Sequence, residues 1–351
     1  MLIKKHQQEP LKKDMRLGFF FFAALLLVFA THLVSEPISI GLTLLSFIAF
    51  TLFAGFYVLL ANPTLIKMLH ADFETKPAHR WLVPCGLWGV ALIYALLSDQ
   101  FTLPLVSLGL LYCLLPFVLY IYLQNAQPIL HWFDVIVILL LWFPIEFGWI
   151  PDLNIPPTSG TVKVYNIIGL ILIIFLYFIL RALPDTGFTY RLKGKDWRSI
   201  IQNFIFFMPF ALIIGLATGF IEFAKRLPPT GEMIASFIAI LFFIALPEEI
   251  LFRGVIHNLL EKRLAPKKNG TVIALVISSV IFGLAHGNNS NPPFLDIDLG
   301  PLGIWHAPWV YILLATIAGV FYGLTYVKTR KVTAAALVHL LVDWVWGVFF
   351  K

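Results

Sequence analysis

The sequence has little charge and little cysteine, and both shortages narrow the class of protein. Only 13% of the 351 residues are charged, whereas 60% are hydrophobic and the mean hydropathy is +0.88. Soluble globular domains carry roughly twice that share of charge, about 25%, so we expect a membrane protein. The two cysteines, Cys85 and Cys113, both lie in apolar runs. They suggest neither a disulfide framework nor a cysteine-based zinc site.

Several motifs of known hydrolases are also missing. The chain has no His-Glu-x-x-His zinc signature and no Gly-x-Ser-x-Gly nucleophile elbow. It has no Gly-x-Gly-Asp aspartate pair, and Ser278 and Ser279 lack the glycine-flanked setting of a rhomboid-type serine. The basic N-terminus leads into a run long enough to remain a membrane helix, so we predict no cleaved signal peptide.

What the sequence does have is apolar runs of about 20 residues, the length that crosses a bilayer. Eleven such runs predict an all-α polytopic transmembrane helix bundle of about 11 spans. The predicted spans are 17–34, 39–61, 82–97, 103–123, 130–150, 164–182, 201–224, 233–260, 271–286, 308–327 and 332–350.

Lysine and arginine fall unevenly on the two sides of these spans. Starting from a cytoplasmic N-terminus, cytoplasmic segments hold 20 of them and outer segments hold 4, with the inner loop 124–129 adding none. Because this bias sets the orientation of membrane proteins, we predict a cytoplasmic N-terminus and an outer C-terminus. The net charge of +6 then reports orientation, and we predict no nucleic-acid partner.

The loop from Pro184 to Ser199 is the best domain boundary. Six predicted spans before it hold few intramembrane charges, and five after it hold nearly all the unusual ones. We therefore predict an accessory transmembrane region over residues 1–190 and the functional domain over residues 191–351.

The strongest candidate site is the run from Met233 to Val255, whose only ionisable residues are Glu248, Glu249 and Arg253. Each intramembrane charge costs a few kcal/mol and indicates function. In a helix, Glu249 and Arg253 lie four residues apart on one face and can pair. Glu248 is rotated by about 100° and is the freer carboxylate, while Pro247 interrupts the hydrogen bonding. The alternative is an ion pair that only locks helices together.

Two further motifs place histidines on other spans. Phe282 and His286 close the ninth span, where an imidazole can act as base, acid or metal ligand. His339 and Asp343 lie four apart on one face of the last span. A carboxylate beside an imidazole fixes its tautomer, or both groups hold a water or a metal. The structural alternatives are a hydrogen-bonded histidine at a helix end and a clamp between helices.

Other polar and aromatic residues in the spans have simpler interpretations. We interpret Asp134 as mostly structural and the histidines His257 and His306 as interfacial, although His306 could reach the site from its loop. Trp344 and Trp346 fit an aromatic belt that anchors the last span in lipid.

Together the three motifs resemble the CPBP family of type II CAAX prenyl endopeptidases and bacteriocin-processing or immunity (Abi) proteins. The family pattern is Glu-Glu-x-x-x-Arg, then Phe-x-x-x-His, then His-x-x-x-Asn or Asp, and it occurs here in order within residues 197–349. The resemblance implies an intramembrane endopeptidase whose cavity opens to the cytoplasm or the inner leaflet. Its substrate would be a membrane-associated peptide or protein, processed as a CAAX-type or a leader- or bacteriocin-type chain.

The resemblance also implies roles. Glu248 would activate the attacking water, His286 and His339 would hold that water or a metal, and Asp343 would assist where CAAX enzymes typically have Asn. Zinc or another divalent metal on these four residues is one expectation, and a metal-free glutamic mechanism is the other. The site residues implied by the motifs are Glu248, Glu249, Arg253, His286, His339 and Asp343.

Two other functions stay open: a non-catalytic immunity or scaffold protein, and a proton-coupled transporter. A transporter predicts two similar halves, and we find no internal repeat. We expect a multi-pass protein of the bacterial cell (inner) membrane, in contact with the lipid bilayer. The motifs predict no particular oligomeric state.

Overall fold

The computed structural model describes residues 5–121, 129–158 and 162–350. It is 74% helical without a closed sheet among these residues, which confirms the all-α prediction. Most of the predicted inner loop 124–129 lies outside the described residues, as do Lys4 and Lys351. The chain forms two compact units: Met1–Pro184 with Phe188–Arg191, and Asp185–Gly187 with Leu192–Lys351.

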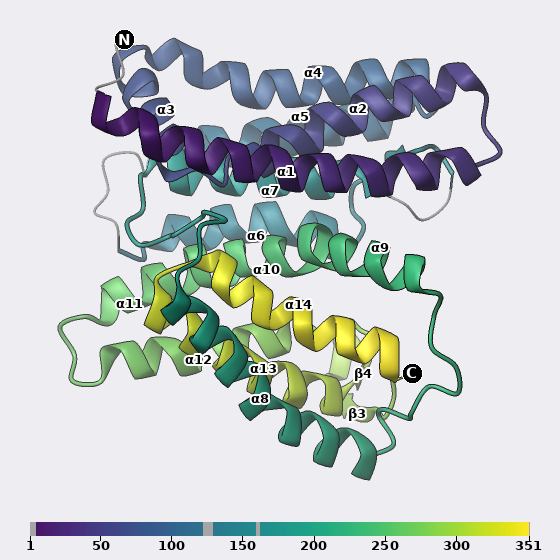
Figure 1. Ribbon diagram of the computed structural model, residues 1–351, viewed down its shortest axis with the longest axis vertical. Helices are drawn as coiled ribbons and strands as arrows, with labels where there is room; N and C mark the ends of the chain where they lie inside the picture. The colour runs from purple at the N-terminus through teal and green to yellow at the C-terminus, as the bar shows by residue number, and fades with distance from the viewer. Residues whose placement is uncertain (1–4, 122–128, 159–161, 351) are drawn as a thin grey trace. The chain divides into compact units, whose positions relative to one another are not determined.

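The first unit consists mainly of apolar helices (Figure 1). Helices α1 and α2 form an antiparallel hairpin in which the rings of Phe29 and Phe50 stack with centroids 3.7 Å apart. The elements are α1 (Lys5–Ser35), α2 (Ile40–Leu59), α3 (Pro63–Thr75), α4 (Leu82–Leu97), α5 (Leu103–Tyr120), α6 (Trp132–Glu146), β1 (Asn154–Ile155), β2 (Val162–Lys163) and α7 (Val164–Ile173), which a π-helical segment (Ile174–Leu180) continues.

A buried ion pair between Asp134 and Arg181 holds helix α6 in the first unit. Asp134 also accepts a hydrogen bond of 2.7 Å from the backbone N–H of His131, so its carboxylate caps the helix start. Arg181 donates a second bond of 2.9 Å to the carbonyl of Ile129. These contacts fit the structural role that we predicted for Asp134.

The second unit is organised around one long helix, Thr230–Leu264, of 35 residues. Two π-helical segments interrupt it, Leu241–Ala245 and Ile250–His257. The elements are α8 (Gly194–Ala217), α9 (Thr230–Ile240), α10 (Leu246–Glu249), α11 (Asn258–Leu264), α12 (Gly270–Leu284), β3 (Leu295–Asp298), β4 (Ile304–Ala307), α13 (Trp309–Thr329) and α14 (Val332–Phe349).

The number of spans differs from the prediction. Across the described residues, eight helices are long and apolar enough to cross a membrane, where we predicted about eleven spans. The apolar helices Val164–Leu180 and Gly270–Leu284 are shorter, and α6 has only 15 residues. All eleven predicted segments contain helices, but these three fall short of the length that the prediction assumed.

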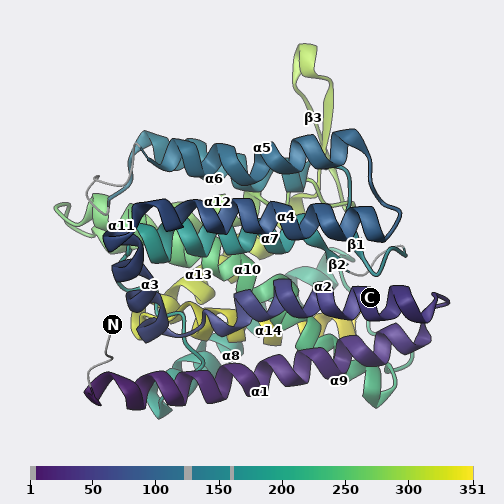
Figure 2. The ribbon, with the colours of Figure 1, turned by 90° about the horizontal axis from the view of Figure 1, so that it is seen from above.

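One helix boundary in the second unit was also wrong. The span predicted at 201–224 ends at Ala217, where Gly219 takes a φ of +68° that glycine adopts without strain. The predicted loop 287–307 contains the antiparallel hairpin of β3 and β4. Figure 2 shows this hairpin extending away from α8 and α13 of its own unit.

Candidate functional site

The long helix changes its hydrogen bonding where the Pro-Glu-Glu sequence occurs. Pro247 has no N–H to donate, and the preceding backbone N–H, that of Leu246, bonds to the carbonyl of Leu241, five residues earlier. Such π segments are rare and often occur at functional sites. The four residues of α10 therefore lie between two widened turns, and these turns set the directions of Glu248 and Glu249.

Glu249 and Arg253 form the ion pair that the helical spacing predicted. Arg253 Nη1 lies 3.0 Å from Glu249 Oε1, and their side chains are 1% and 0% exposed. Arg253 Nη2 donates a 2.8 Å bond to the carbonyl of Gly319 in α13. A side chain on Gly319 would start 3.3 Å from that nitrogen, so glycine allows the close approach. The guanidinium also lies over the ring of Phe282, 4.5 Å from its centroid.

His339 joins this buried pair to the other carboxylates. Its Nδ1 lies 3.1 Å from Glu249 Oε1, and its Nε2 lies 3.2 Å from Asp343 Oδ2 and 3.9 Å from Glu248 Oε2. Three carboxylates from two helices thus surround one imidazole. The predicted i, i+4 pairing of His339 with Asp343 is confirmed, and Glu248 is indeed separate from the Glu249–Arg253 pair.

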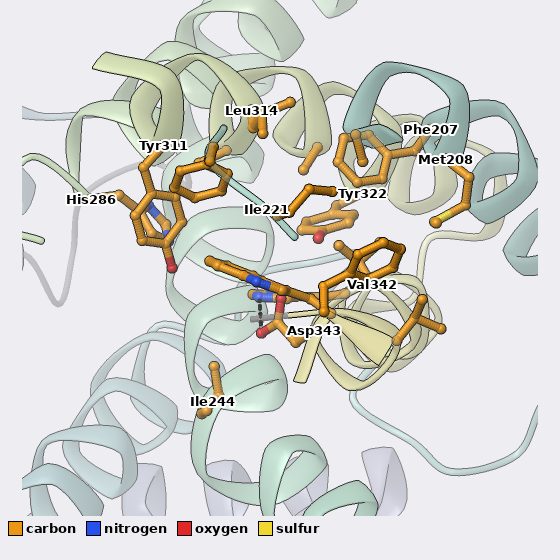
Figure 3. Close-up of a pocket in the computed structure, with 18 of the residues that line it drawn as sticks. Phe207, Met208, Ile221, Ile244, His286, Tyr311, Leu314, Tyr322, Val342 and Asp343 are labelled. Atoms are coloured by element: carbon orange, nitrogen blue, oxygen red, sulfur yellow. Dashed lines mark ion pairs between the residues drawn. The ribbon is translucent and has the colours of Figure 1, made fainter. Parts of the chain in front are cut away.

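A cavity of about 110 Å³ lies beside this cluster. Its polar wall consists of Glu248, His286, His339 and Asp343, so residues from all three sequence motifs face one space. Figure 3 shows Asp343 near the middle of the pocket, with a dashed line for its ion pair. The rest of the lining is almost entirely apolar or aromatic. Glu249 and Arg253 do not line the cavity and act on it through His339.

His286 approaches from the end of α12. Its Nδ1 lies 2.8 Å from the carbonyl oxygen of Phe282. A carbonyl can only accept, so we assign the proton to Nδ1, and Nε2 is the nitrogen directed to other partners. The ring also contacts Tyr311, with centroids 5.0 Å apart, and the two residues lie on the same side of the pocket (Figure 3).

Sequence reasoning missed three aromatic residues of the site. The ring of Tyr322 stacks on His339, with centroids 4.6 Å apart and planes at 17°. Tyr311 and Trp346 pack edge to face in the same pocket lining. Aromatic residues in apolar helices resemble ordinary core residues, and none of these three lies at i, i+4 spacing from a histidine, so the sequence held no local signal for them.

The structure gives other histidines and tryptophans specific partners. His257 is fully buried inside the unit, with Nδ1 3.0 Å from Ser278 Oγ. Trp346 lines the pocket, and Trp344 donates a 2.9 Å bond to the carbonyl of Met233. His306 pairs with an aspartate on the exposed hairpin and is not part of the pocket lining.

The donor geometry bears on whether the site could hold a metal. Among the residues that the structure describes, no group of three or more His, Cys, Asp or Glu is arranged around a possible metal position. Both nitrogens of His339 face carboxylate oxygens, and a ring that donates on both sides has no lone pair for a metal. In this arrangement His339 would have to turn away from a carboxylate to act as a metal ligand.

The fold and the site define an integral membrane protein of helices with a charged cluster beside an apolar pocket. Comparison with protein families then gives a match at residues 230–345 to the Rce1-like type II CAAX prenyl endopeptidases. This match covers all three motifs and confirms the resemblance to the CPBP family for that segment. Searches of curated proteins and of solved structures gave no match. At the family level, the match supports a CAAX-type intramembrane protease.

Proposed function

We propose that the second unit hydrolyses a peptide bond in a membrane-associated peptide or protein, with Glu248 as general base. The observation that carries this proposal is the state of the Glu248 carboxylate. Its Oε2 is enclosed and has no hydrogen-bond partner within the described structure, yet Glu248 lines the cavity. An enclosed carboxylate oxygen without a donor favours a water molecule as its partner.

The reaction then needs a proton carrier and a positive charge. Glu248 takes a proton from the water as the water oxygen attacks the carbonyl carbon of the substrate. The carbon–nitrogen bond breaks, and Glu248 returns the proton to the leaving amine, which gives a carboxylate and an amine. Negative charge develops on the carbonyl oxygen in between, and donors fixed in advance stabilise it.

His339 supplies the positive charge in this proposal. Glu249 and Asp343 accept from its two nitrogens and so favour the doubly protonated ring. The Glu249–Arg253 pair contacts His339 on the side of Nδ1. It positions His339 and does not touch the substrate. His286 offers Nε2 from the end of α12, where it orients the water or the carbonyl group.

The proposal is tested by profiling new protein N-termini in membranes from cells that express the wild type or Glu248→Gln. We expect a set of N-termini that occurs only with the wild type, at equal amounts of folded protein. Glu248→Asp serves as a matched control that keeps the charge but shortens the side chain, and it should retain partial activity. Identical N-terminal profiles for the wild type and Glu248→Gln would contradict the proposal and favour a scaffold role.

A further inference from the structure

The pocket occupies one end of the second unit. It begins at His339, eight residues after Lys331, which is about 12 Å at 1.5 Å per residue. It extends along α14 to Phe350, about 28 Å from Lys331 on the same scale. The α8 residues in its lining, Phe207 to Leu212, belong to the second half of that helix, and Phe220 and Ile221 follow the helix end.

The opposite end of the same unit is strongly basic. Arg330 donates to Glu261 at 3.0 Å, and Lys331 donates to Asp196 at 2.6 Å. These two bonds join the start of α8, the end of α11 and the turn between α13 and α14 at one end. Ten basic residues of the unit lie in these segments: Lys193, Lys195, Arg198, Lys262, Arg263, Lys267, Lys268, Lys328, Arg330 and Lys331.

The end of the unit that holds the pocket has more acidic than basic residues. Two basic residues of the described unit lie beyond the helix ends there, Lys225 and Arg226. Acidic residues of that end are Glu222, Glu232, Asp296 and Asp298. Figures 1 and 2 both show the turn between α11 and α12 at one end of the unit and the C-terminus at the other.

We propose that the pocket opens on the side of the membrane opposite the cytoplasm. Lys and Arg in short loops stay on the cytoplasmic side, so the basic end faces the cytoplasm and the end with Phe220 and Phe350 faces away from it. The resemblance to CAAX enzymes led to the opposite expectation, a cavity that opens to the cytoplasm or inner leaflet. The charges of this unit and the position of its cavity instead favour an opening on the non-cytoplasmic side.

The substrate class follows if the proposed function holds. The scissile bond would belong to a membrane-anchored chain and would lie in the half of the bilayer away from the cytoplasm. The pocket wall formed by Phe207, Met208, Leu212 and Leu314 is apolar, so the substrate residue beside that bond is apolar. Such a chain need not carry a prenyl group.

Cysteine accessibility in intact cells tests the orientation without any substrate. In the full chain with Cys85→Ala and Cys113→Ala, single cysteines are introduced by Ser290→Cys in the loop before β3, by Lys268→Cys at the basic end and by Val345→Cys in the pocket lining. The probe is a permanently cationic, membrane-impermeant methanethiosulfonate, which the carboxylates of the pocket attract. Ser290 and Lys268 are both exposed and form a matched pair.

We expect labelling of Ser290→Cys and Val345→Cys in intact cells, and labelling of Lys268→Cys only after permeabilisation. Labelling of Lys268→Cys in intact cells, or protection of Val345→Cys from the outside, would overturn the inference. Because these results need no cleavage, they are independent of the Glu248→Gln comparison. A failure of the proposed function and a failure of the proposed orientation are therefore distinguishable.

Discussion

Both units bury a carboxylate–guanidinium pair among apolar helices, but the two carboxylates differ in their further contacts. In the first unit, the carboxylate of Asp134 binds Arg181 and the backbone of its own helix start. In the second unit, Glu249 binds both Arg253 and His339, and His339 continues the network to Asp343 and the pocket. An intramembrane charge alone therefore does not indicate a functional site. A charged network that ends at a cavity does indicate one.

The largest expected effect on stability comes from removing either arginine. Arg253→Met leaves Glu249 buried without its cation, and such a loss costs about 3–5 kcal/mol. Arg181→Met should lower the free energy of unfolding by a similar amount, because it leaves Asp134 buried without its cation. Thermal unfolding in detergent measures both. We expect cleavage per folded molecule to fall only for Arg253→Met, because only Glu249 is connected to the pocket. An equal fall in cleavage for both variants would contradict this difference between the two units.

A smaller effect is expected at the aromatic neighbours of the two networks. Tyr322→Leu removes the ring that stacks on His339, a contact of about 0.5–1.5 kcal/mol, so we expect cleavage to slow by up to about tenfold. Tyr322→Phe keeps the ring and should cost less than about twofold. Tyr177 donates to the backbone carbonyl of Asp134 in the first unit, and Tyr177→Phe should lower stability by about 1 kcal/mol without changing cleavage.

The smallest expected effect is that of metal removal. Because both nitrogens of His339 face carboxylates, incubation with a strong zinc chelator should change the cleavage rate by less than about twofold. The measurement is the rate before and after chelation, with added zinc as the control. Loss of activity that zinc restores would show that His339 rearranges to bind a metal.

The sequence was informative where a local rule applied. The i, i+4 spacing predicted the Glu249–Arg253 and His339–Asp343 contacts, because a helix fixes those neighbours. The family pattern placed Glu248, His286 and His339 in one site, and the structure brings them to one cavity. Their catalytic roles stay predictions.

The misses arose where tertiary contacts decide. Nothing near His257 in the sequence indicates Ser278 as its partner, so burial could not be separated from an interfacial position. Trp346 was interpreted as a lipid anchor, and Tyr322 was not singled out, because their contacts in the pocket come from other helices. The hairpin had a signal that we did not use, since apolar and polar residues alternate in Leu295–Asp298.

The central claim is tested most directly by comparing Glu248→Gln with Asp134→Asn in cleavage and in thermal unfolding. Glu248→Gln removes the proposed base, and a general base contributes about 10²–10⁴-fold to a rate. We predict that Glu248→Gln loses cleavage by that factor with an unchanged unfolding midpoint, whereas Asp134→Asn unfolds earlier and keeps its cleavage per folded molecule. Full cleavage by Glu248→Gln, or a loss of cleavage explained by its unfolding, would contradict the account.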